Sequence, residues 1–550
     1  MLWTLIYVFV FLTIGYFLWR WLSVPVDWTE PTTATVRSGK YDWESPSFTA
    51  EGPFFIKPWL QPGNTPTYQA DGLESMEILF HTASSVGACR VEIQALEGTA
   101  DERNKVLIYR PEARSFDLTG VKHQVQYVTK LTGLLPGTSY AYKIFFGVDE
   151  VFSSTFLTRV PRGEEFRAII FGDMGSGSPW QKQIAYQMSL DAAGAKYTLH
   201  GDNGQFVVHK MPRGAHLVIA TGDMVYHHGR YNEYLSRFFP VYQAPVTSPE
   251  TGASLLDRVM VMPVTGNHDM GKYDPEVLMS FSEYPDLMAY FALFSLPLNG
   301  FAGDHVLGEN EKSKAGGQQL GANLPPMIGD TQARQALLTA AGDRYPRMAN
   351  YSYDYGNVHW LCLDANTYMD WTDEKMRAWV RQDLMSVPKG VWKVVVFHHP
   401  PFTSNRKHQR EQGMRFLADI FEECGVSIVF CGHAHLYERT RPLKFKATHG
   451  ISNASRNEAG YVSGSITMDP VYDGTVNKRP DGVIYVTTGG GGAKLDSLDI
   501  AAAPNKWQPF TAKFVADRHS FTLVDFTRDA IKVKQIDLNG VEVDSFEIQA

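Results

Sequence analysis

A series of short, almost entirely apolar runs between Phe166 and Val486 constrains the fold of this chain most strongly. Each run spans four to six residues and lacks the polar alternation of a strand that has one face in water. The runs lie at 167–171, 217–220, 259–264, 359–363, 393–397, 426–430 and 483–486. Strands of this kind are buried on both faces, so other layers must cover them on either side. The sequence therefore predicts a layered α/β domain, which we assign to residues 165–550.

Helix-like segments separate several of these runs, and we expect helices at 180–192, 373–385 and 410–423. The segment 296–344 contains clustered Gly, Asn, Lys and Gln without a clean period, so we expect much of it to be an insertion. From residue 510 onward the sequence returns to polar and apolar alternation, which predicts strands that pack back onto the domain. The four glycines at 489–492 lack the Lys and the Ser or Thr of a P-loop, so we expect a tight backbone turn there.

Short alternating runs also occupy residues 53–160. They are separated by Gly, Pro and Asn turns, a spacing that predicts a small all-β sandwich. The stretch Leu131–Lys143 is similar to the turn between strands E and F of fibronectin type III domains, which implies a fibronectin type III-like fold. Residues 23–52 are rich in Pro, Ser and Thr and have no sustained period, so we expect a linker there.

Residues 1–22 form a hydrophobic segment, of which the 18 positions Leu2–Trp19 carry no charge. In a helix these positions would span roughly 27 Å, near the lower limit for crossing a bilayer. Three alternatives are open: a cleaved signal peptide, an uncleaved membrane anchor, or a buried helix of the folded domain. We favour the anchor, because the segment has neither a basic leading region nor a small-x-small cleavage site after it. The protein is therefore expected to be exported, either membrane-anchored on the extracytoplasmic side or secreted.

The composition excludes several classes of protein. Hydrophobic residues make up 44% and charged residues 20%, which fits neither a disordered chain nor a coiled coil. The net charge of −8, without long runs of one sign, argues against a nucleic-acid partner. The 4 cysteines form no C-x-x-C pair, so we expect neither a disulfide scaffold nor a zinc or redox motif. A small-molecule substrate is the class of partner that remains.

Residue types that bind metals follow five of the apolar runs. These segments read Gly172-Asp173-Met-Gly, Gly222-Asp223-Met-Val-Tyr226, Gly266-Asn267-His268-Asp269, His398-His399-Pro and Gly432-His433-Ala-His435. A single segment of this type is more often a turn or a structural histidine. Ligands of open α/β sheets bind outside the carboxyl ends of the strands, so five segments in that position indicate one shared site.

The ordered motifs G-D-x-G, G-D-x-x-Y, G-N-H-D, V-x-x-H and G-H-x-H resemble those of purple acid phosphatases, a branch of the binuclear metallophosphoesterases. The resemblance spans Gly172–His435, and the preceding sandwich and the longer motif Gly432–Arg439 also match. It implies a layered metallophosphoesterase β-sandwich flanked by helices, preceded by the small all-β domain and the N-terminal hydrophobic helix.

The resemblance also implies seven metal ligands. The first ion would bind Asp173, Tyr226 and His435, Asp223 would bridge the two ions, and the second ion would bind Asn267, His398 and His433. We take His398 rather than His399 as the ligand, because Val395-Val-Phe-His398 satisfies the V-x-x-H spacing and the His-x-Pro that follows. Aspartate and tyrosinate oxygens are hard donors that suit Fe(III), whereas an amide carbonyl with two imidazoles suits Zn(II), Mn(II) or Fe(II). We therefore expect a binuclear centre of Fe(III) with one of these divalent ions.

Two histidines are candidate catalytic residues. Two ions roughly 3.5–4 Å apart can hold phosphoryl oxygens and lower the pKa of a water, but the leaving alkoxide still needs a proton. His268 is the first candidate donor and His408 the second. The plant members of the family carry a His pair where this chain has Lys407-His408, so a solvated loop histidine is the alternative for His408. We expect Asp269 and Tyr437 to support the ligands without binding metal.

The leading functional hypothesis is a metal-dependent hydrolase of phosphate monoesters, acid phosphatase-like, with a small phosphate ester as substrate. A phosphodiesterase or nucleotide pyrophosphatase on the same scaffold is the closest alternative, since two-metal sites serve either class of ester. A non-catalytic surface adhesion protein with a degenerate phosphatase domain is an alternative of another class, and the complete ligand set argues against it. The N-terminal segment makes the membrane a second expected partner.

Overall fold

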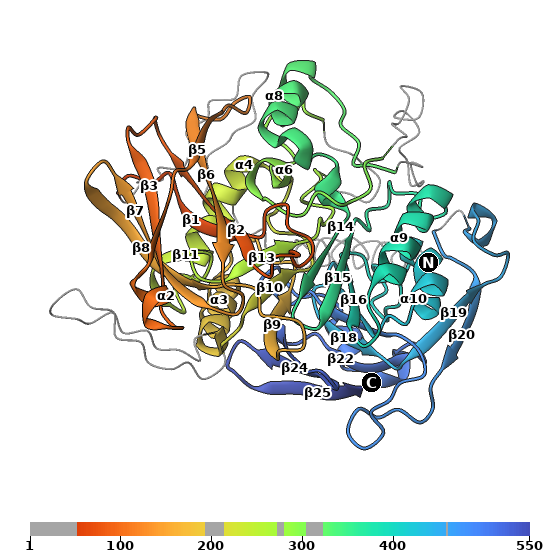
Figure 1. The fold of residues 1–550 in the computed structure, drawn as a ribbon. Helices are drawn as coiled ribbons and strands as arrows, with labels where there is room; N and C mark the ends of the chain where they lie inside the picture. Colours follow the sequence, from red (N-terminus) through yellow and green to blue (C-terminus); the bar gives the residue numbers. More distant parts are fainter. Residues whose placement is uncertain (1–51, 193–213, 272–279, 304–322, 458–459) are drawn as a thin grey trace, which may run out of the picture. The chain divides into compact units, whose positions relative to one another are not determined.

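The computed structural model describes residues 52–192, 214–271, 280–303, 323–457 and 460–550 (Figure 1). The predicted membrane segment 1–22 and the predicted linker, up to residue 51, lie outside the described residues. Within the described ranges, no helix is long and apolar enough to cross a membrane. Phe48–Ala550 form one compact unit, and its described residues contain a β-sandwich followed by an α/β domain.

The β-sandwich consists of two four-stranded antiparallel sheets, in the orders β1-β2-β6-β5 and β4-β3-β7-β8. Its elements are β1 (Ile56–Gln61), β2 (Glu74–Thr82), β3 (Cys89–Ala95), α2 (Ala100–Asn104), β4 (Val106–Tyr109), β5 (Glu112–Phe116), β6 (Gln124–Leu134), β7 (Ser139–Phe146) and β8 (Asp149–Leu157). With the strands lettered in chain order and β4 as an extra strand beside C, the sheets become A-B-E-D and C-F-G, the arrangement of immunoglobulin-like sandwiches. The predicted small sandwich is therefore present, and its closer likeness to fibronectin type III domains stays a prediction.

The turn between β6 and β7 is closed by a tyrosine. The Tyr140 hydroxyl, near the start of β7, accepts a 2.9 Å hydrogen bond from the backbone N–H of Leu135. The ring of Tyr140 is buried and stacks on Phe156 with 5.6 Å between ring centroids. This is the geometry of the tyrosine corner in immunoglobulin-like domains.

Two sheets form the core of the α/β domain (Figure 1). The first sheet has six strands, in the order β13 (Met260–Pro263), β10 (Leu217–Ala220), β9 (Phe166–Phe171), β23 (Ser520–Phe526), β24 (Ala530–Asp537) and β25 (Glu542–Gln549). The second has seven, in the order β14 (Tyr351–Tyr355), β15 (Val358–Leu363), β16 (Trp392–Phe397), β17 (Ile428–Cys431), β21 (Ile484–Thr488), β18 (Tyr437–Thr440) and β22 (Thr511–Val515). Each apolar run of the sequence forms one of these strands, and those strands pair in parallel with one another within each sheet.

The two sheets pack face to face through buried aromatic side chains. Phe166 of the first sheet lies 4.8 Å from Tyr355 of the second, measured between ring centroids, and Phe526 lies 5.3 Å from Trp360. At the end of β9, the backbone N–H of Gly172 donates a 3.0 Å hydrogen bond to the carbonyl of Thr488 on β21. The carboxyl ends of strands from both sheets are thereby held next to one another.

The C-terminal strands pack onto the domain as predicted. β23 runs antiparallel to β9 and continues the first sheet into β24 and β25. Arg167 on β9 pairs with Asp525 on β23 at 2.7 Å, directly across the ladder. The first three parallel strands of the domain therefore depend on the last part of the chain to cover their edge.

Helices and two short ladders complete the domain. They are α3 (Pro179–Ala192), α4 (Tyr231–Glu233), α5 (Phe239–Tyr242), α6 (Tyr290–Leu293), α8 (Thr331–Ala341), α9 (Glu374–Ser386), α10 (Ala418–Glu423), α11 (Leu498–Ala501), β11 (Gln243–Ser248) with β12 (Gly252–Ser254), and β19 (Leu443–Ala447) with β20 (Gly464–Met468). α3 and α9 confirm the helices predicted at 180–192 and 373–385.

The helix predicted at 410–423 is wrong in its first half. Gly413–Leu417 form a 3-10 helix, and only α10 is α-helical. Tertiary hydrogen bonds explain the difference, because the Gln412 side chain accepts from the backbone N–H of Val462 and Glu411 bonds to His433. These contacts hold the segment in turns against its local helix propensity.

The segment 296–344 is more regular than we expected. It contains α8, whose N-terminus is capped by Asp330 through a 2.7 Å hydrogen bond from the backbone N–H of Ala333. The helix ends at Gly342, which has a φ of 56°. An Asp before the helix and a Gly after it are ordinary boundary signals, so the caps locate α8 better than its hydrophobic pattern does. Residues 304–322 of this segment lie outside the described residues.

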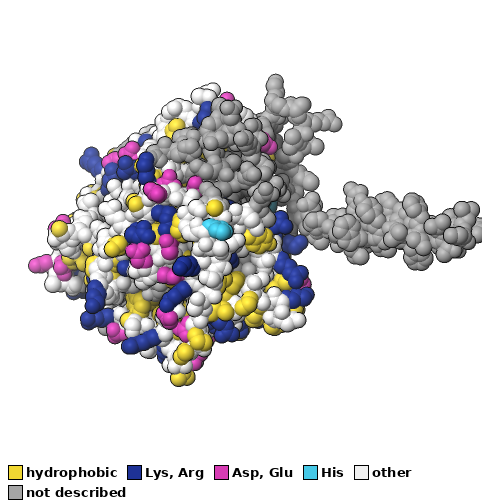
Figure 2. Space-filling view, turned by 90° about the vertical axis from the view of Figure 1, so that its right-hand side faces the viewer, with side chains coloured by type: hydrophobic (Ala, Val, Ile, Leu, Met, Phe, Trp, Pro, Cys, Tyr) yellow, Lys and Arg dark blue, Asp and Glu magenta, His cyan; other side chains and the backbone are white. Residues whose placement is uncertain are grey.

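Charged side chains of both signs are mixed on the face of the molecule shown in Figure 2. Lys and Arg alternate there with Asp and Glu over short distances, and neither sign forms an extended patch. On that face, the field of one charge is offset by neighbours of the other sign.

A buried ionic network joins the sandwich to the second sheet. Arg159, at the end of the sandwich, pairs with Glu74 at 2.9 Å and donates to the backbone carbonyl of Asp354 on β14. His359 on β15 lies between Asp354 and Asp383, with 2.8 Å from each ring nitrogen to a carboxylate oxygen. Burial lowers the pKa of His359, but the two carboxylates outweigh burial and raise this pKa to about 9. The imidazole is therefore protonated at neutral pH.

This network predicts a pH-dependent stability. Because folding raises the pKa of His359 from 6.5 to about 9, the protonated imidazole stabilises the fold fully below pH 6.5. This stabilisation is lost as the pH rises through about 9. The shift corresponds to roughly 3 kcal/mol in the free energy of unfolding. We expect the destabilisation caused by His359→Gln to shrink by about this amount between pH 6.5 and 9.5, measured by urea unfolding.

His123→Gln is the matched control, because His123 pairs with Asp117 at the surface, where solvent screens the interaction. Its effect on the free energy of unfolding should stay small and nearly constant over the same pH range. A constant difference between the parent protein and His359→Gln would contradict the assigned protonation state of His359.

Candidate metal centre

The loops that follow β9, β10 and β17 hold their polar residues in strained backbone conformations. Asp173, Asp223 and His433 have φ values of 58°, 52° and 67°, a region that residues other than glycine rarely adopt. The glycine before a ligand is required by close approach: a Cβ on Gly266 would lie 2.1 Å from Oδ1 of Asp223, and one on Gly432 would lie 2.7 Å from Oδ2 of Asp173. The G-D, G-N and G-H motifs are therefore a packing requirement of this site.

The glycine run 489–492 lies beside the same loops, in irregular backbone rather than in a hydrogen-bonded turn. A Cβ on Gly489 would lie 2.2 Å from the carbonyl of Ala434, and one on Gly491 would lie 2.2 Å from the carbonyl of Gly172. Just after the run, the backbone N–H of Ala493 donates to the carbonyl of Asp173 at 2.9 Å. The glycine run packs its backbone closely against these loops, and this packing holds Asp173 in place.

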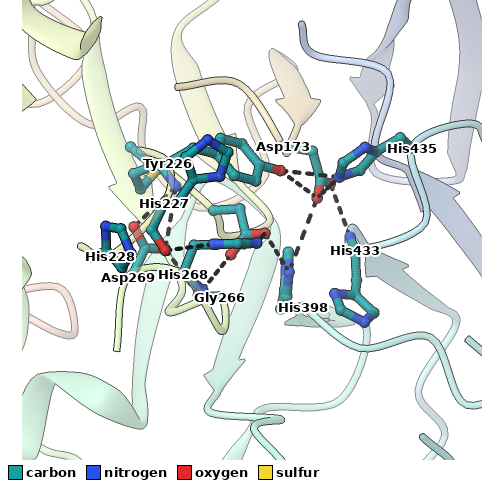
Figure 3. Close-up of polar contacts among 12 residues, drawn as sticks. Asp173, Tyr226, His227, His228, Gly266, His268, Asp269, His398, His433 and His435 are labelled. Atoms are coloured by element: carbon teal, nitrogen blue, oxygen red, sulfur yellow. Dashed lines mark hydrogen bonds and ion pairs between the residues drawn. The ribbon is translucent and has the colours of Figure 1, made fainter. Parts of the chain in front are cut away.

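The residues predicted for the first ion lie together (Figure 3). The Tyr226 hydroxyl lies 3.2 Å from Oδ1 of Asp173 and 3.1 Å from Nε2 of His435. Nε2 of His435 is 3.4 Å from the same Asp173 oxygen. Three donor atoms of different chemistry therefore face one point, although the residues lie up to 262 positions apart.

The residues predicted for the bridge and the second ion lie beside them. Oδ2 of Asp223 is 3.3 Å from Nε2 of His398, and one potential ligand atom from each of Asp223, His398 and His433 lies within 4.8 Å of the others. Nε2 of His398 is 4.0 Å from Oδ1 of Asp173, which connects the two groups. Asn267 is buried between Gly266 and His268, whose backbones both approach Asp223. The structure thus brings six of the seven predicted ligands into one cluster, and the seventh, Asn267, lies on a loop beside it.

The hydrogen bonds of the histidines fit a pair of cations at this cluster. Nδ1 of His398 donates to the carbonyl of Thr221 at 2.7 Å, and Nδ1 of His435 donates to the carbonyl of Lys494 at 2.7 Å. Since a carbonyl can only accept, the Nε2 atoms that face the carboxylates are the nitrogens free to bind metal. In the described part of the chain, buried Nε2 of His398 makes no hydrogen bond. A metal-binding histidine is held by its other nitrogen in this way.

The electrostatics of the cluster also favour positive charge. Burial lowers the pKa of His398, but the negative charge of Asp223 outweighs burial and raises this pKa to about 10. The pKa of Asp223 is raised by burial and lowered more strongly by His398 and His268, so its carboxyl stays ionised. The cluster therefore attracts cations, and its oxygen and nitrogen donors suit the hard and borderline metals expected from the sequence.

Comparison with known proteins agrees with this geometry. The calcineurin-like phosphoesterase family matches residues 166–437, the part of the chain that carries the whole cluster. Residues 166–437 thus match a calcineurin-like phosphoesterase domain.

Several individual proteins are similar to parts of this chain. Purple acid phosphatase 23 of Arabidopsis thaliana is 31% identical over 163 residues, and a nucleotide pyrophosphatase/phosphodiesterase of Hordeum vulgare is 26% identical over 215 residues. The alignments cover 28% and 36% of this chain, and 28% and 50% of the two relatives. The solved purple acid phosphatase PPD1 of yellow lupin (Lupinus luteus) seeds shares the fold, with a TM-score of 0.54 and 17% identity over 90% of this chain and 74% of that chain.

His268 lies at the edge of the cluster in the phosphoesterase domain. Its backbone N–H donates to Oδ1 of Asp223 at 2.9 Å, and its Nδ1 donates to the carbonyl of His227 at 2.7 Å. Nε2 lies 3.9 Å from Oδ2 of Asp223, and the side chain keeps 15% of its surface exposed. The ring packs on Tyr226 with 4.5 Å between centroids. An imidazole in this position can reach both the cluster and a molecule arriving from solvent.

His408 is buried, so the alternative of a solvated loop histidine is wrong. Its Nδ1 lies 3.1 Å from Oε2 of Glu411, and its Nε2 lies 3.6 Å from Oδ2 of Asp496. The ring packs on His433 with 4.0 Å between centroids. Both nitrogens face carboxylates of the protein, an arrangement that orients His433 and Glu411. The catalytic role suggested by the sequence stays a prediction.

The expectation that Asp269 and Tyr437 support the predicted ligands is confirmed for Asp269 and wrong for Tyr437. The carboxylate of Asp269 accepts hydrogen bonds from the backbone N–H groups of Met224 and Gly266, at 3.0 and 2.9 Å, and thereby ties two ligand loops together. The Tyr437 hydroxyl donates instead to Asp544 on β25 at 2.8 Å. Tyr437 therefore connects β18 of the second sheet to β25 of the first.

Glu411 contacts the cluster although no sequence motif marks it. Its Oε2 lies 2.6 Å from Nε2 of His433, so the carboxylate holds one ring nitrogen of a predicted ligand. Glu411 and His433 are 22 positions apart, and no motif joins them. The spacing of three residues between His408 and Glu411 was the one local signal.

Removing the Glu411 carboxylate should weaken binding of the second ion. We expect Glu411→Ala to lower the affinity of the metal-free protein for Zn(II) by about 10–100-fold, because His433 loses the partner that fixes its ring. Titration against a fluorescent zinc chelator measures this affinity. Glu423→Ala is the control, since Glu423 forms only an exposed pair with Arg381 in the described structure. Equal affinities of Glu411→Ala and the parent protein would refute the role of Glu411.

Proposed function

We propose that this protein hydrolyses phosphate monoesters at a binuclear metal centre, as an acid phosphatase-like enzyme. The observation that carries the proposal is the convergence of carboxylate, phenol and imidazole donors at the carboxyl ends of strands from two sheets. When bound, two ions would supply Lewis-acid stabilisation of the phosphoryl oxygens and lower the pKa of a water.

The donor set supports a division into two sites. Asp173, Tyr226 and His435 would hold the first ion, with two hard oxygen donors that suit Fe(III). Asn267, His398 and His433 would hold a divalent ion, Zn(II), Mn(II) or Fe(II), and Asp223 would lie between the two. The nitrogen atoms available for binding are fixed by the hydrogen bonds of the other ring nitrogens.

His268 would carry the proton for the leaving group. Its Nδ1–H is held by the carbonyl of His227, so Nε2 is the nitrogen that can exchange a proton with the departing oxygen. This nitrogen lies beside Asp223 and at the exposed edge of the cluster. The proposed role agrees with both the position and the orientation of the ring.

A phosphodiesterase or nucleotide pyrophosphatase remains a second candidate, favoured by the similarity to the barley protein of that name. Rates of hydrolysis of an aryl phosphate and of a bis-aryl phosphate separate the two candidates. A strong preference for the diester would replace the phosphomonoesterase proposal. The complete ligand set argues against a non-catalytic adhesion protein.

Two further expectations extend the proposal beyond the phosphoesterase domain. The sandwich would be fibronectin type III-like, which its strand order and the Tyr140 corner support. The protein would be exported, membrane-anchored on the extracytoplasmic side or secreted, which the uncharged stretch Leu2–Trp19 supports. Protease protection of the tagged chain in sealed cells tests the export.

Replacing the proposed bridging ligand should abolish activity. We expect Asp223→Asn to lower kcat/KM for an aryl phosphate by at least about 100-fold. The amide carries no charge and has only one oxygen atom, whereas a bridge between two ions requires a charged group with two oxygen donors. Asp517→Asn is the control, since Asp517 pairs with Arg518 at the surface. Undiminished hydrolysis by Asp223→Asn would rule out the bridging role.

The proposed Tyr226–Fe(III) bond predicts a coloured protein. A phenolate bound to Fe(III) absorbs visible light through charge transfer, so the loaded protein should be purple or pink and Tyr226→Phe should lose the band. Tyr234→Phe should keep it, because the Tyr234 hydroxyl contacts Asp269 in place of the first-ion ligands. A colourless, active protein that elemental analysis finds free of iron would remove Tyr226 from the ligand set.

A further inference from the structure

The loop that follows Tyr226 is held by one carboxylate. Glu233, the last residue of α4, accepts hydrogen bonds from the backbone N–H groups of His227, His228 and Arg230, at 2.5, 3.0 and 3.0 Å. Nδ1 of His228 lies 3.3 Å from the same carboxylate. A carboxylate that receives several N–H groups forms charge-assisted hydrogen bonds, which are stronger than neutral ones.

The Glu233 carboxylate is well placed to keep this arrangement. Its side chain is 12% exposed, so water competes little for the oxygen atoms. Burial raises the pKa of Glu233, but the hydrogen bond and charge of His228, the backbone N–H of Arg230 and the charge of Arg237 outweigh burial and bring this pKa to about 2. The carboxylate is therefore charged at any pH at which the protein would be assayed.

The loop is also packed tightly from its other side. Gly229 has a φ of 66°, and a Cβ there would lie 2.2 Å from the carbonyl of Asp269. Its own carbonyl accepts from the backbone N–H of Ala289 at 3.1 Å. The backbone of 227–230 is thus fixed between Glu233 and the loop that carries His268 and Asp269.

This fixed backbone reaches His268 through one hydrogen bond. The carbonyl of His227 accepts from Nδ1 of His268 at 2.7 Å, which requires the proton to lie on Nδ1 (Figure 3). Nε2 of His268 then lies 3.9 Å from Oδ2 of Asp223. The peptide that contains this carbonyl also contains the N–H of His228, which donates to Glu233 at 3.0 Å. Moving this peptide would therefore change both the position and the tautomer of the His268 ring.

We propose that Glu233 is a positioning residue for His268: by clamping the backbone of 227–230, it presents the His227 carbonyl that fixes the orientation and the tautomer of the imidazole. This inference rests on the proposed function in assigning a proton to His268. It adds a residue that does not touch the cluster and that no motif in the sequence marks.

Nitrogen chemical shifts of the histidines test the proposal without any activity. In metal-free protein labelled with ¹⁵N-histidine, the His268 signals, assigned by their loss in His268→Asn, should show a protonated Nδ1 and an unprotonated Nε2. Glu233→Ala should convert them to a mixture of tautomers, and Glu233→Gln, which keeps one acceptor oxygen, should give an intermediate result. Unchanged His268 signals in a folded Glu233→Ala protein would overturn the proposal.

Kinetics of the loaded enzyme supply the second measurement. We expect Glu233→Ala to lower kcat for aryl phosphates by about 10–100-fold, with KM little changed and with the largest loss for the most basic leaving group. In a His268→Asn background the same substitution should have no further effect on kcat. Bound iron and divalent ion should remain at the parental level.

Controls separate the possible failures. Glu74→Gln removes another buried carboxylate, the partner of Arg159 in the sandwich, and should lower stability without moving the His268 signals. If Glu233→Ala does not fold, Glu233→Gln decides the question, and parental shifts and kcat in that folded variant would overturn the proposal. A parent protein with the expected His268 tautomer but no hydrolysis of any phosphate ester would refute the proposed function and leave the positioning role standing.

Discussion

Burial of two carboxylates at neighbouring strand ends is the constraint on which the rest of the site depends. Asp173 and Asp223 follow the adjacent parallel strands β9 and β10 and are almost completely removed from solvent. Taking an ionised carboxylate out of water costs several kcal/mol unless opposite charge and hydrogen bonds offset the loss. Within the described structure, the two carboxylates form hydrogen bonds and ion pairs with backbone N–H groups, the Tyr226 hydroxyl and imidazoles, and with no Lys or Arg side chain. Such partners leave room for metal ions to provide the positive charge.

The two sheets contribute different chemistry to this site. The loops after β9, β10 and β13 carry the oxygen donors Asp173, Asp223, Tyr226 and Asn267, whereas those after β16 and β17 carry the imidazoles His398, His433 and His435. The backbone N–H of His433 also donates to Oδ2 of Asp173 at 2.9 Å, so the sheets meet through the predicted ligands themselves. The face-to-face packing of the sheets therefore determines which donors can share an ion.

The sequence predicts the parts of the fold that depend on local pattern. Continuous apolar runs identify the parallel strands because burial on both faces leaves no position for a polar residue. The sequence also marks the glycines before Asp223 and Asn267, because the loops approach one another so closely there that no larger residue fits. The failures are contacts between distant residues. Nothing local shows that Glu411 bonds to His433, that Glu233 clamps a loop, or that Tyr437 turns toward Asp544.

The same distinction explains why a helix was expected at 410–423 and α8 was not. A sequence pattern predicts the conformation that a segment prefers in isolation. The polar side chains between His408 and Gln412 instead form tertiary hydrogen bonds, which a local pattern does not show. In a metal site such exceptions concentrate, because each ligand needs a second residue to hold its other end. Residues that break their local pattern beside a ligand loop are therefore where orienting groups such as Glu411 are to be found. His408 fits this description too: both of its ring nitrogens face carboxylates, and its ring packs against that of His433.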